Sequence, residues 1–207
     1  MARASLTRRA SRVTAAFAVL PVLLLVASPA SAHIVSTGLG PAYDSVWHFL
    51  LSPAYVAPVV GIALFAGLRG ADHGRWALFT VATGWLAGEL VGAAPPAGLP
   101  SSLSTAATFL IIGSLVAADL RVPLLLTALT AGVVGVLGGA MDRAAQGASI
   151  GLSGTLGVCI AVFVLSAITA SLIVPLQILW LRIAVRVAGS WLAALGLLLV
   201  GWAARTK

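Results

Sequence analysis

Charged residues are scarce in this 207-residue chain, because Asp, Glu, Lys and Arg together make up only 8% of it. An ordinary soluble domain has about 25%. Hydrophobic residues make up 60%. This composition excludes a soluble single-domain enzyme and a disordered chain. The single cysteine, Cys159, cannot form an internal disulfide and so says nothing about the redox compartment. The sequence predicts an integral membrane protein that has the lipid bilayer as its surroundings.

The formal net charge of +7 does not indicate a nucleic-acid partner, because it is concentrated at the start of the chain. Residues 1–12 are basic, Val13 to Ala27 are apolar, and the small residues Ala30-Ser31-Ala32 follow. This order is typical of a secretory signal peptide. We therefore predict that residues 1–32 are removed and that the mature chain begins outside the cytoplasm at His33. An α-amine and an imidazole on one residue can chelate a transition metal.

Apolar runs separated by Gly, Pro or charge predict the membrane-spanning segments, since a spanning helix needs about 20 apolar residues. We expect an all-α membrane protein, a bundle of six transmembrane helices over residues 53–203. An extracytoplasmic amphipathic segment, 33–52, precedes the bundle, and a short tail, 204–207, follows it. The six runs lie near 53–68, 76–93, 104–118, 122–141, 151–175 and 178–203.

Arginine is distributed unevenly between the two predicted sides of the bundle. With His33 outside, the connections near 69–75, 119–121 and 176–186 face inward and carry five arginines, whereas the outer connections carry one. This asymmetry follows the positive-inside rule and predicts a multi-pass protein of a bacterial cytoplasmic membrane. Glycines also recur at helical spacing and predict close helix contacts. They are Gly84, Gly88, Gly132, Gly135, Gly138 and Gly139.

Few side chains remain that could carry chemistry. Asp44 and His48 are four residues apart and share a face if the segment is helical, so they could bind one metal. The alternative is a helix-capping Asp and an interfacial His. Glu89 lies inside an apolar run, where an ionisable residue usually faces a cavity or a partner. The alternative is that its carboxylate reaches the lipid headgroups.

Two more acidic positions leave alternatives open. Asp142 fits either a solvated loop pair with Arg143 or an additional metal ligand on the outer side. Asp72 and His73 fit a solvated inner turn or a site of metal release. The full set of candidate metal ligands is therefore His33, Asp44, His48, Glu89 and Asp142. Their donors suit Ni, Co, Zn or Cu without choosing among them.

No enzymatic constellation accompanies these residues. Gly151-Leu152-Ser153-Gly154 has the pattern found around the serine of intramembrane rhomboid-type proteases, but no histidine follows His73 to accept the serine proton. We therefore expect a protein that is not an enzyme and has no catalytic residues.

Several stretches of the sequence resemble the HupE/UreJ family of hydrogenase and urease accessory membrane proteins. They are His33 directly after the signal peptide, the His-containing stretch from Tyr43 to Pro53, the run from Val60 to Gly67, and the run from Ile112 to Ala118 followed by Arg121-Val122-Pro123-Leu124. The resemblance implies a nickel or cobalt permease that supplies metalloenzyme maturation, with metalloenzyme-maturation proteins as partners. The family's first His-rich element corresponds here to His48 with Asp44, and the second has no counterpart. The alternative is a non-transporting membrane accessory or scaffold subunit.

Overall fold

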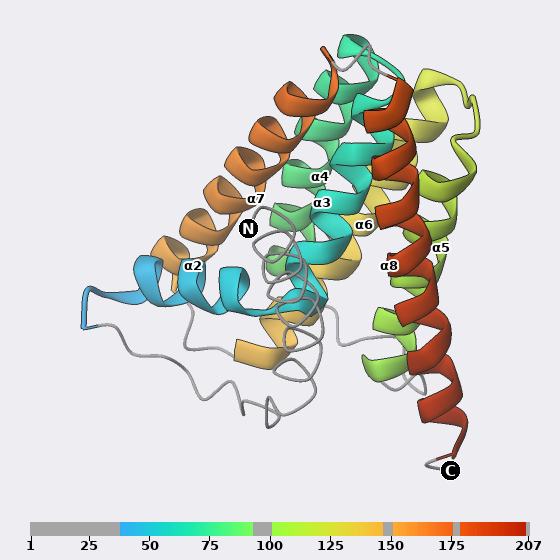
Figure 1. The fold of residues 1–207 in the computed structure, drawn as a ribbon. Coiled ribbons are helices and arrows are strands. Elements are labelled where there is room, and N and C mark those ends of the chain that lie inside the picture. Colours follow the sequence, from blue (N-terminus) through green and yellow to red (C-terminus); the bar gives the residue numbers. More distant parts are fainter. Residues whose placement is uncertain (1–37, 93–100, 147–150, 176–178, 206–207) are drawn as a thin grey trace, which may run out of the picture. The chain divides into compact units, whose positions relative to one another are not determined.

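The structure, a computed structural model, describes residues 38–92, 101–146, 151–175 and 179–205. The predicted signal peptide and His33 lie outside these ranges. Within them all regular structure is helical, with seven helices and no strand, which confirms the all-α prediction (Figure 1). The helices are α2 (Pro41–Leu51), α3 (Pro53–Gly67), α4 (Ala71–Val91), α5 (Ser101–Ala118), α6 (Leu124–Gln146), α7 (Leu152–Ile173) and α8 (Leu179–Arg205).

The amphipathic segment expected near residues 41–51 is helix α2, and it meets α3 at a sharp bend of 75°. The break is at Ser52, whose backbone is extended and whose hydroxyl donates a 2.6 Å hydrogen bond to the carbonyl of His48. Pro53 then opens α3, where a missing N–H costs nothing. The bend sets the direction from which α2 approaches the other helices.

Each of the six apolar runs overlaps one helix, from α3 to α8. By length and composition, three helices of the described chain can cross a membrane, and a fourth span results if α2 and α3 count as one bent element. The three are α6, α7 and the part of α8 from Arg182 to Arg205, whereas the apolar part of α5, Ser102–Ala118, is shorter. The chain is thus membrane-embedded and multi-pass in character.

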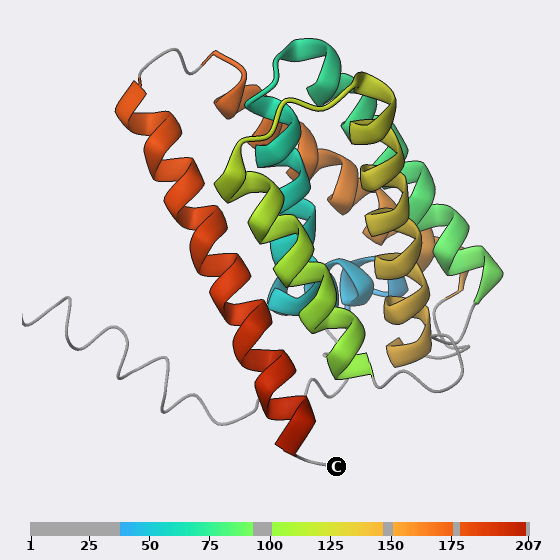
Figure 2. The same ribbon diagram turned by 90° about the vertical axis from the view of Figure 1, so that its right-hand side faces the viewer.

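Glycines allow two pairs of helices to pack at backbone distance: α4 with α6, as the sequence predicts, and α5 with α8 (Figure 2). Between α4 and α6, a Cβ on Gly84 would lie 2.5 Å from the carbonyl oxygen of Gly132, and one on Gly88 would overlap that of Val136. Between α5 and α8, a Cβ on Gly113 would overlap the backbone of Ala193. Helix α3 lies between these pairs, since it contacts α4, α5, α6, α7 and α8.

Three connections that the sequence assigns to one side of the membrane do lie together. A guanidinium nitrogen of Arg69, between α3 and α4, donates to the carbonyl of Leu120, between α5 and α6. Arg182, near the start of α8, donates a 3.4 Å hydrogen bond to the carbonyl of Leu68. These connections therefore share one end of the described helices, and α2 lies toward the other end (Figure 1).

Candidate cation-binding site

Two buried carboxyl groups meet between α4 and α6. Glu89 is 2% exposed and Asp142 is fully buried, and the two side chains are neighbours across the contact between α4 and α6. The glycine packing explains this proximity, because a Cβ on Gly139 would overlap the carbonyl oxygen of Trp85 and lie 3.1 Å from the amide nitrogen of Glu89. Asp142 is three residues beyond Gly139 and so lies on the same face of α6.

His48 of α2 completes a row of three ionisable side chains. Its Nε2 lies 3.6 Å from Oδ1 of Asp142, and its side chain is 12% exposed. The same Oδ1 accepts a 2.9 Å hydrogen bond from the amide of Gln146, whose own Oε1 lies 3.5 Å from the hydroxyl of Ser45. Burial lowers the pKa of His48 from its ordinary value, which favours the neutral imidazole that can act as a ligand.

Aromatic rings enclose the row on the side of α3. The Trp85 ring makes edge contacts with Phe49 and Tyr55, with centroids 5.4 Å and 6.0 Å away, and Tyr55 lies 5.9 Å from the His48 ring. Beyond Tyr55 and Trp85 is a cavity of about 20 Å³, enough for one water molecule. On the α7 side, the Thr155 hydroxyl donates a 3.5 Å hydrogen bond to Oε2 of Glu89. The carboxyl pair therefore lies in an environment with little water.

Four buried polar atoms of this cluster have no hydrogen-bond partner among the described residues: His48 Nε2, Trp85 Nε1, Glu89 Oε1 and Asp142 Oδ2. Buried polar groups are normally hydrogen-bonded, and unpaired ones cost about 1–3 kcal/mol each. Two carboxyl groups in contact away from water also need a proton or a cation between them, since like charges there repel strongly. The cluster thus requires either a shared proton or a bound cation.

The predicted convergence of four or five metal ligands is not found. In the part of the chain that the structure describes, no group of three or more His, Cys, Asp or Glu side chains is arranged to hold a metal ion. His48, Asp142 and Glu89 form a row instead. Two ligands at about 2.1 Å from a tetrahedral ion are about 3.4 Å apart. The 3.6 Å between His48 Nε2 and Asp142 Oδ1 fits such a pair of ligands.

Asp142 differs most from its expected setting. The sequence places it at the start of an outer connection, with Arg143 as a solvated partner, but α6 continues to Gln146 and buries the carboxyl group completely. The expected boundary followed the loss of hydropathy after Met141. No Gly or Pro interrupts the next residues, and Arg, Ala and Gln are good helix formers, so the helix extends by more than one turn.

The remaining candidate metal ligands lie outside the group of His48, Asp142 and Glu89. Asp44 is half-buried in the first turn of α2, one turn before His48. Asp72 is exposed, as expected, and forms a 2.5 Å ion pair with Arg75, but it lies in the first turn of α4 and not in a connecting turn. His73 Nδ1 lies 2.9 Å from the hydroxyl of Thr127 on α6, at the opposite end of α4 from Glu89. His33 lies outside the described residues.

The polar contributors missing from the sequence-based prediction include Gln146, Thr155 and Tyr55. Their side chains are polar but neutral, so a search for ionisable residues passes over them. Only Gln146 carries a local signal, because it follows Asp142 at helical spacing.

Comparison with protein-family models, with curated proteins and with solved structures finds no match to this chain. The fold and the site therefore define a class: an all-helical, membrane-embedded multi-pass protein with paired carboxyl groups buried among its helices. Within that class, the particular function must be argued from the site itself.

Proposed function

We propose that this chain binds a divalent transition metal ion at His48, Asp142 and Glu89 and carries it through the bilayer, as its resemblance to the HupE/UreJ family implies. The observation that supports this proposal is the buried carboxyl pair beside a neutral imidazole, with four polar atoms lacking partners. Intramembrane ionisable residues are costly and usually mark an ion pathway. An imidazole with carboxylates suits Ni, Co, Zn or Cu, and the resemblance favours nickel or cobalt.

The three side chains act in sequence in this proposal. His48 is the most accessible of the three and is the first ligand for an entering ion. Asp142 supplies the second ligand, held in place by Gln146. Glu89, on the α4 side of Asp142, provides the compensating charge as the ion leaves bulk water. Water molecules or a small movement of Glu89 supply the remaining coordination, since two protein ligands alone leave a divalent ion open.

In this proposal the chain lies in a bacterial cytoplasmic membrane. Helices α3 to α8 each cross the bilayer, and α2 lies on the extracytoplasmic side. The support is the grouping of the arginine-bearing connections at the end away from α2, because cytoplasmic loops are enriched in arginine. His48 would then face the outside, where the ion enters.

One observation favours a second function, that of a non-transporting accessory subunit. An apolar groove of about 820 Å³ runs along α4 and α6, between Trp76 at one end and Leu137 at the other. A groove of this kind can receive a helix of a membrane partner. In that function, the carboxyl pair would only stabilise the contact between α4 and α6.

Metal binding by purified protein distinguishes the two functions. Calorimetric titration with Ni, Co, Cu and Zn should show binding by the wild type. His48→Ala and Glu89→Gln should each weaken this binding by at least about 10-fold, because even the loss of a residue that only hydrogen-bonds to a metal ligand has an effect of that size. The double variant should lose less than the sum of the two effects. Asp72→Asn, far from the site and equally acidic, is the matched control and should bind as the wild type does. If the wild type binds no metal more tightly than the double variant, the accessory function replaces transport.

A further inference from the structure

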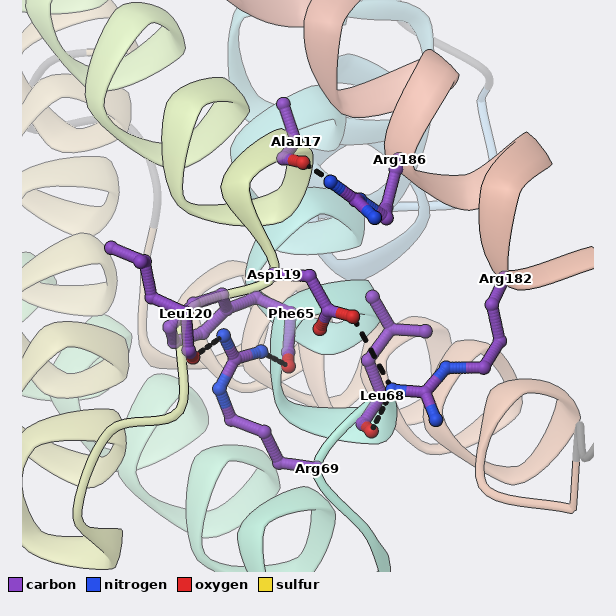
Figure 3. A network of polar contacts seen from close by, with 8 residues as sticks. All are labelled: Phe65, Leu68, Arg69, Ala117, Asp119, Leu120, Arg182 and Arg186. Atoms are coloured by element: carbon purple, nitrogen blue, oxygen red, sulfur yellow. Dashed lines mark hydrogen bonds and ion pairs between the residues drawn. The ribbon is translucent and has the colours of Figure 1, made fainter. Parts of the chain in front are cut away.

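A second charged cluster lies at the end of the helices away from the candidate cation site. Three arginines from two segments, Arg69, Arg182 and Arg186, gather there around a single acidic residue, Asp119. Figure 3 shows Asp119 between the guanidinium groups of Arg69 and Arg182. The cluster therefore carries an excess of positive charge that no described side chain balances.

Hydrogen bonds hold two of these arginines in fixed positions. Arg182 donates from Nη2 to Asp119 at 3.3 Å and to the carbonyl of Leu68 at 3.4 Å. One turn later on α8, Arg186 donates from Nε to the carbonyl of Ala117 at 2.9 Å (Figure 3). Within the described chain, Nη1 and Nη2 of Arg186 and Nη1 of Arg182 make no hydrogen bond. Two ordered guanidinium groups thus keep donors available for an anion.

The interior of the cluster is also short of negative charge. Arg69 lies over the Phe65 ring and donates to the carbonyls of Phe65 and Leu120, but its buried Nε has no partner in the part of the chain that the structure describes. Burial lowers the pKa of Arg69 and the nearby positive charge of Arg182 lowers it further, while Asp119 opposes both effects. An additional anion would relieve the repulsion between Arg69 and Arg182.

The surroundings of the two arginines on α8 favour a lipid over a free anion. Ile183 and Val187, each next to one of the arginines, are 49% and 50% exposed, and Trp180 at the start of the helix is 65% exposed. Exposed apolar side chains along a spanning helix face acyl chains, and Trp is typical of the membrane interface. A phospholipid combines an anionic headgroup with acyl chains and matches both features.

We propose that Arg182 and Arg186, supported by Arg69, bind the phosphate of an anionic phospholipid headgroup where α8 enters the membrane. Basic pockets between spanning helices bind anionic headgroups, and each basic residue near the surface contributes enough to change affinity about five-fold. The occupant is a lipid of the leaflet on that side. This site is independent of metal binding at the other end of the helices.

Lipid binding to the purified full-length protein tests the site. In micelles of a zwitterionic detergent, phosphatidylglycerol should raise the melting temperature and remain bound in native mass spectrometry, whereas phosphatidylcholine with the same acyl chains should do neither. Arg186→Gln should weaken phosphatidylglycerol binding about five-fold. Arg205→Gln, at the far end of the same helix, is the matched control and should leave it unchanged.

Asp119→Asn separates a lipid site from a purely structural network. Removing the competing carboxylate should strengthen phosphatidylglycerol binding even where it lowers the melting temperature of the lipid-free protein. Equal binding of the two lipids, or equal losses in Arg186→Gln and Arg205→Gln, would overturn the proposal. So would inorganic phosphate alone matching the stabilisation by phosphatidylglycerol, because the occupant would then be a free anion.

Discussion

Replacing Gly139 by alanine tests whether the close packing of α4 and α6 creates the cation site. The new methyl group would overlap the carbonyl oxygen of Trp85 and lie 2.9 Å from its carbonyl carbon. Both are backbone atoms, which cannot move aside without shifting the helix. Overpacking of this kind costs about 1–3 kcal/mol. The better helix propensity of alanine returns up to about 1 kcal/mol. We expect a net loss of about 1–2 kcal/mol in the free energy of unfolding.

The same substitution should also weaken metal binding, because parted helices move Glu89 away from Asp142 although both residues remain. Unfolding in mixed detergent micelles, followed by tryptophan fluorescence, measures the first effect, and calorimetry measures the second. Gly201→Ala is the control, since a Cβ at this helical position meets nothing within 4 Å. If Gly139→Ala is as stable as Gly201→Ala and binds metal equally well, the glycine contact does not build the site.

Three further predictions test the topology, one helix contact and the start of the mature chain. On a Cys159→Ala background, Asp72→Cys should react with an impermeant thiol reagent only after permeabilisation, and labelling of intact cells would invert the proposed orientation. Thr127→Val removes the partner of His73 and should cost about 1 kcal/mol of stability, whereas Thr130→Val, which loses an exposed bond within α6, should cost less. N-terminal sequencing of membrane-purified protein should begin at His33, and a start well upstream would refute cleavage.

The helices could be predicted from the sequence because each depends on local information. Apolar runs and Pro53 at the start of α3 mark the elements directly. The close contact between α4 and α6 could also be predicted, because their glycines recur at helical spacing and small residues on one face permit close packing in a membrane. Hydropathy could not show where α6 ends, because a helix continues past the apolar run wherever no residue stops it.

The candidate site could be predicted only in part, because it depends on contacts between distant segments. His48 and Glu89 stand out as ionisable residues near apolar runs. The burial of Asp142 depends on the packing of α6 against α4, and the surroundings of Glu89 depend also on the packing of α4 against α7, neither of which the local sequence reveals. The contributions of Gln146 and Thr155 follow from the same packing and have no ionisable signature.

Metal uptake into sealed vesicles tests the central claim most directly. The purified chain is reconstituted into liposomes that contain a metal-sensitive dye, and nickel, cobalt or zinc is added outside. The account predicts dye quenching with the wild type and with Asp72→Asn, and its loss with Asp142→Asn, which removes the charge at the centre of the row but keeps its shape. Uptake by Asp142→Asn at the wild-type rate, or no uptake by the wild type for any of the three ions, would contradict it.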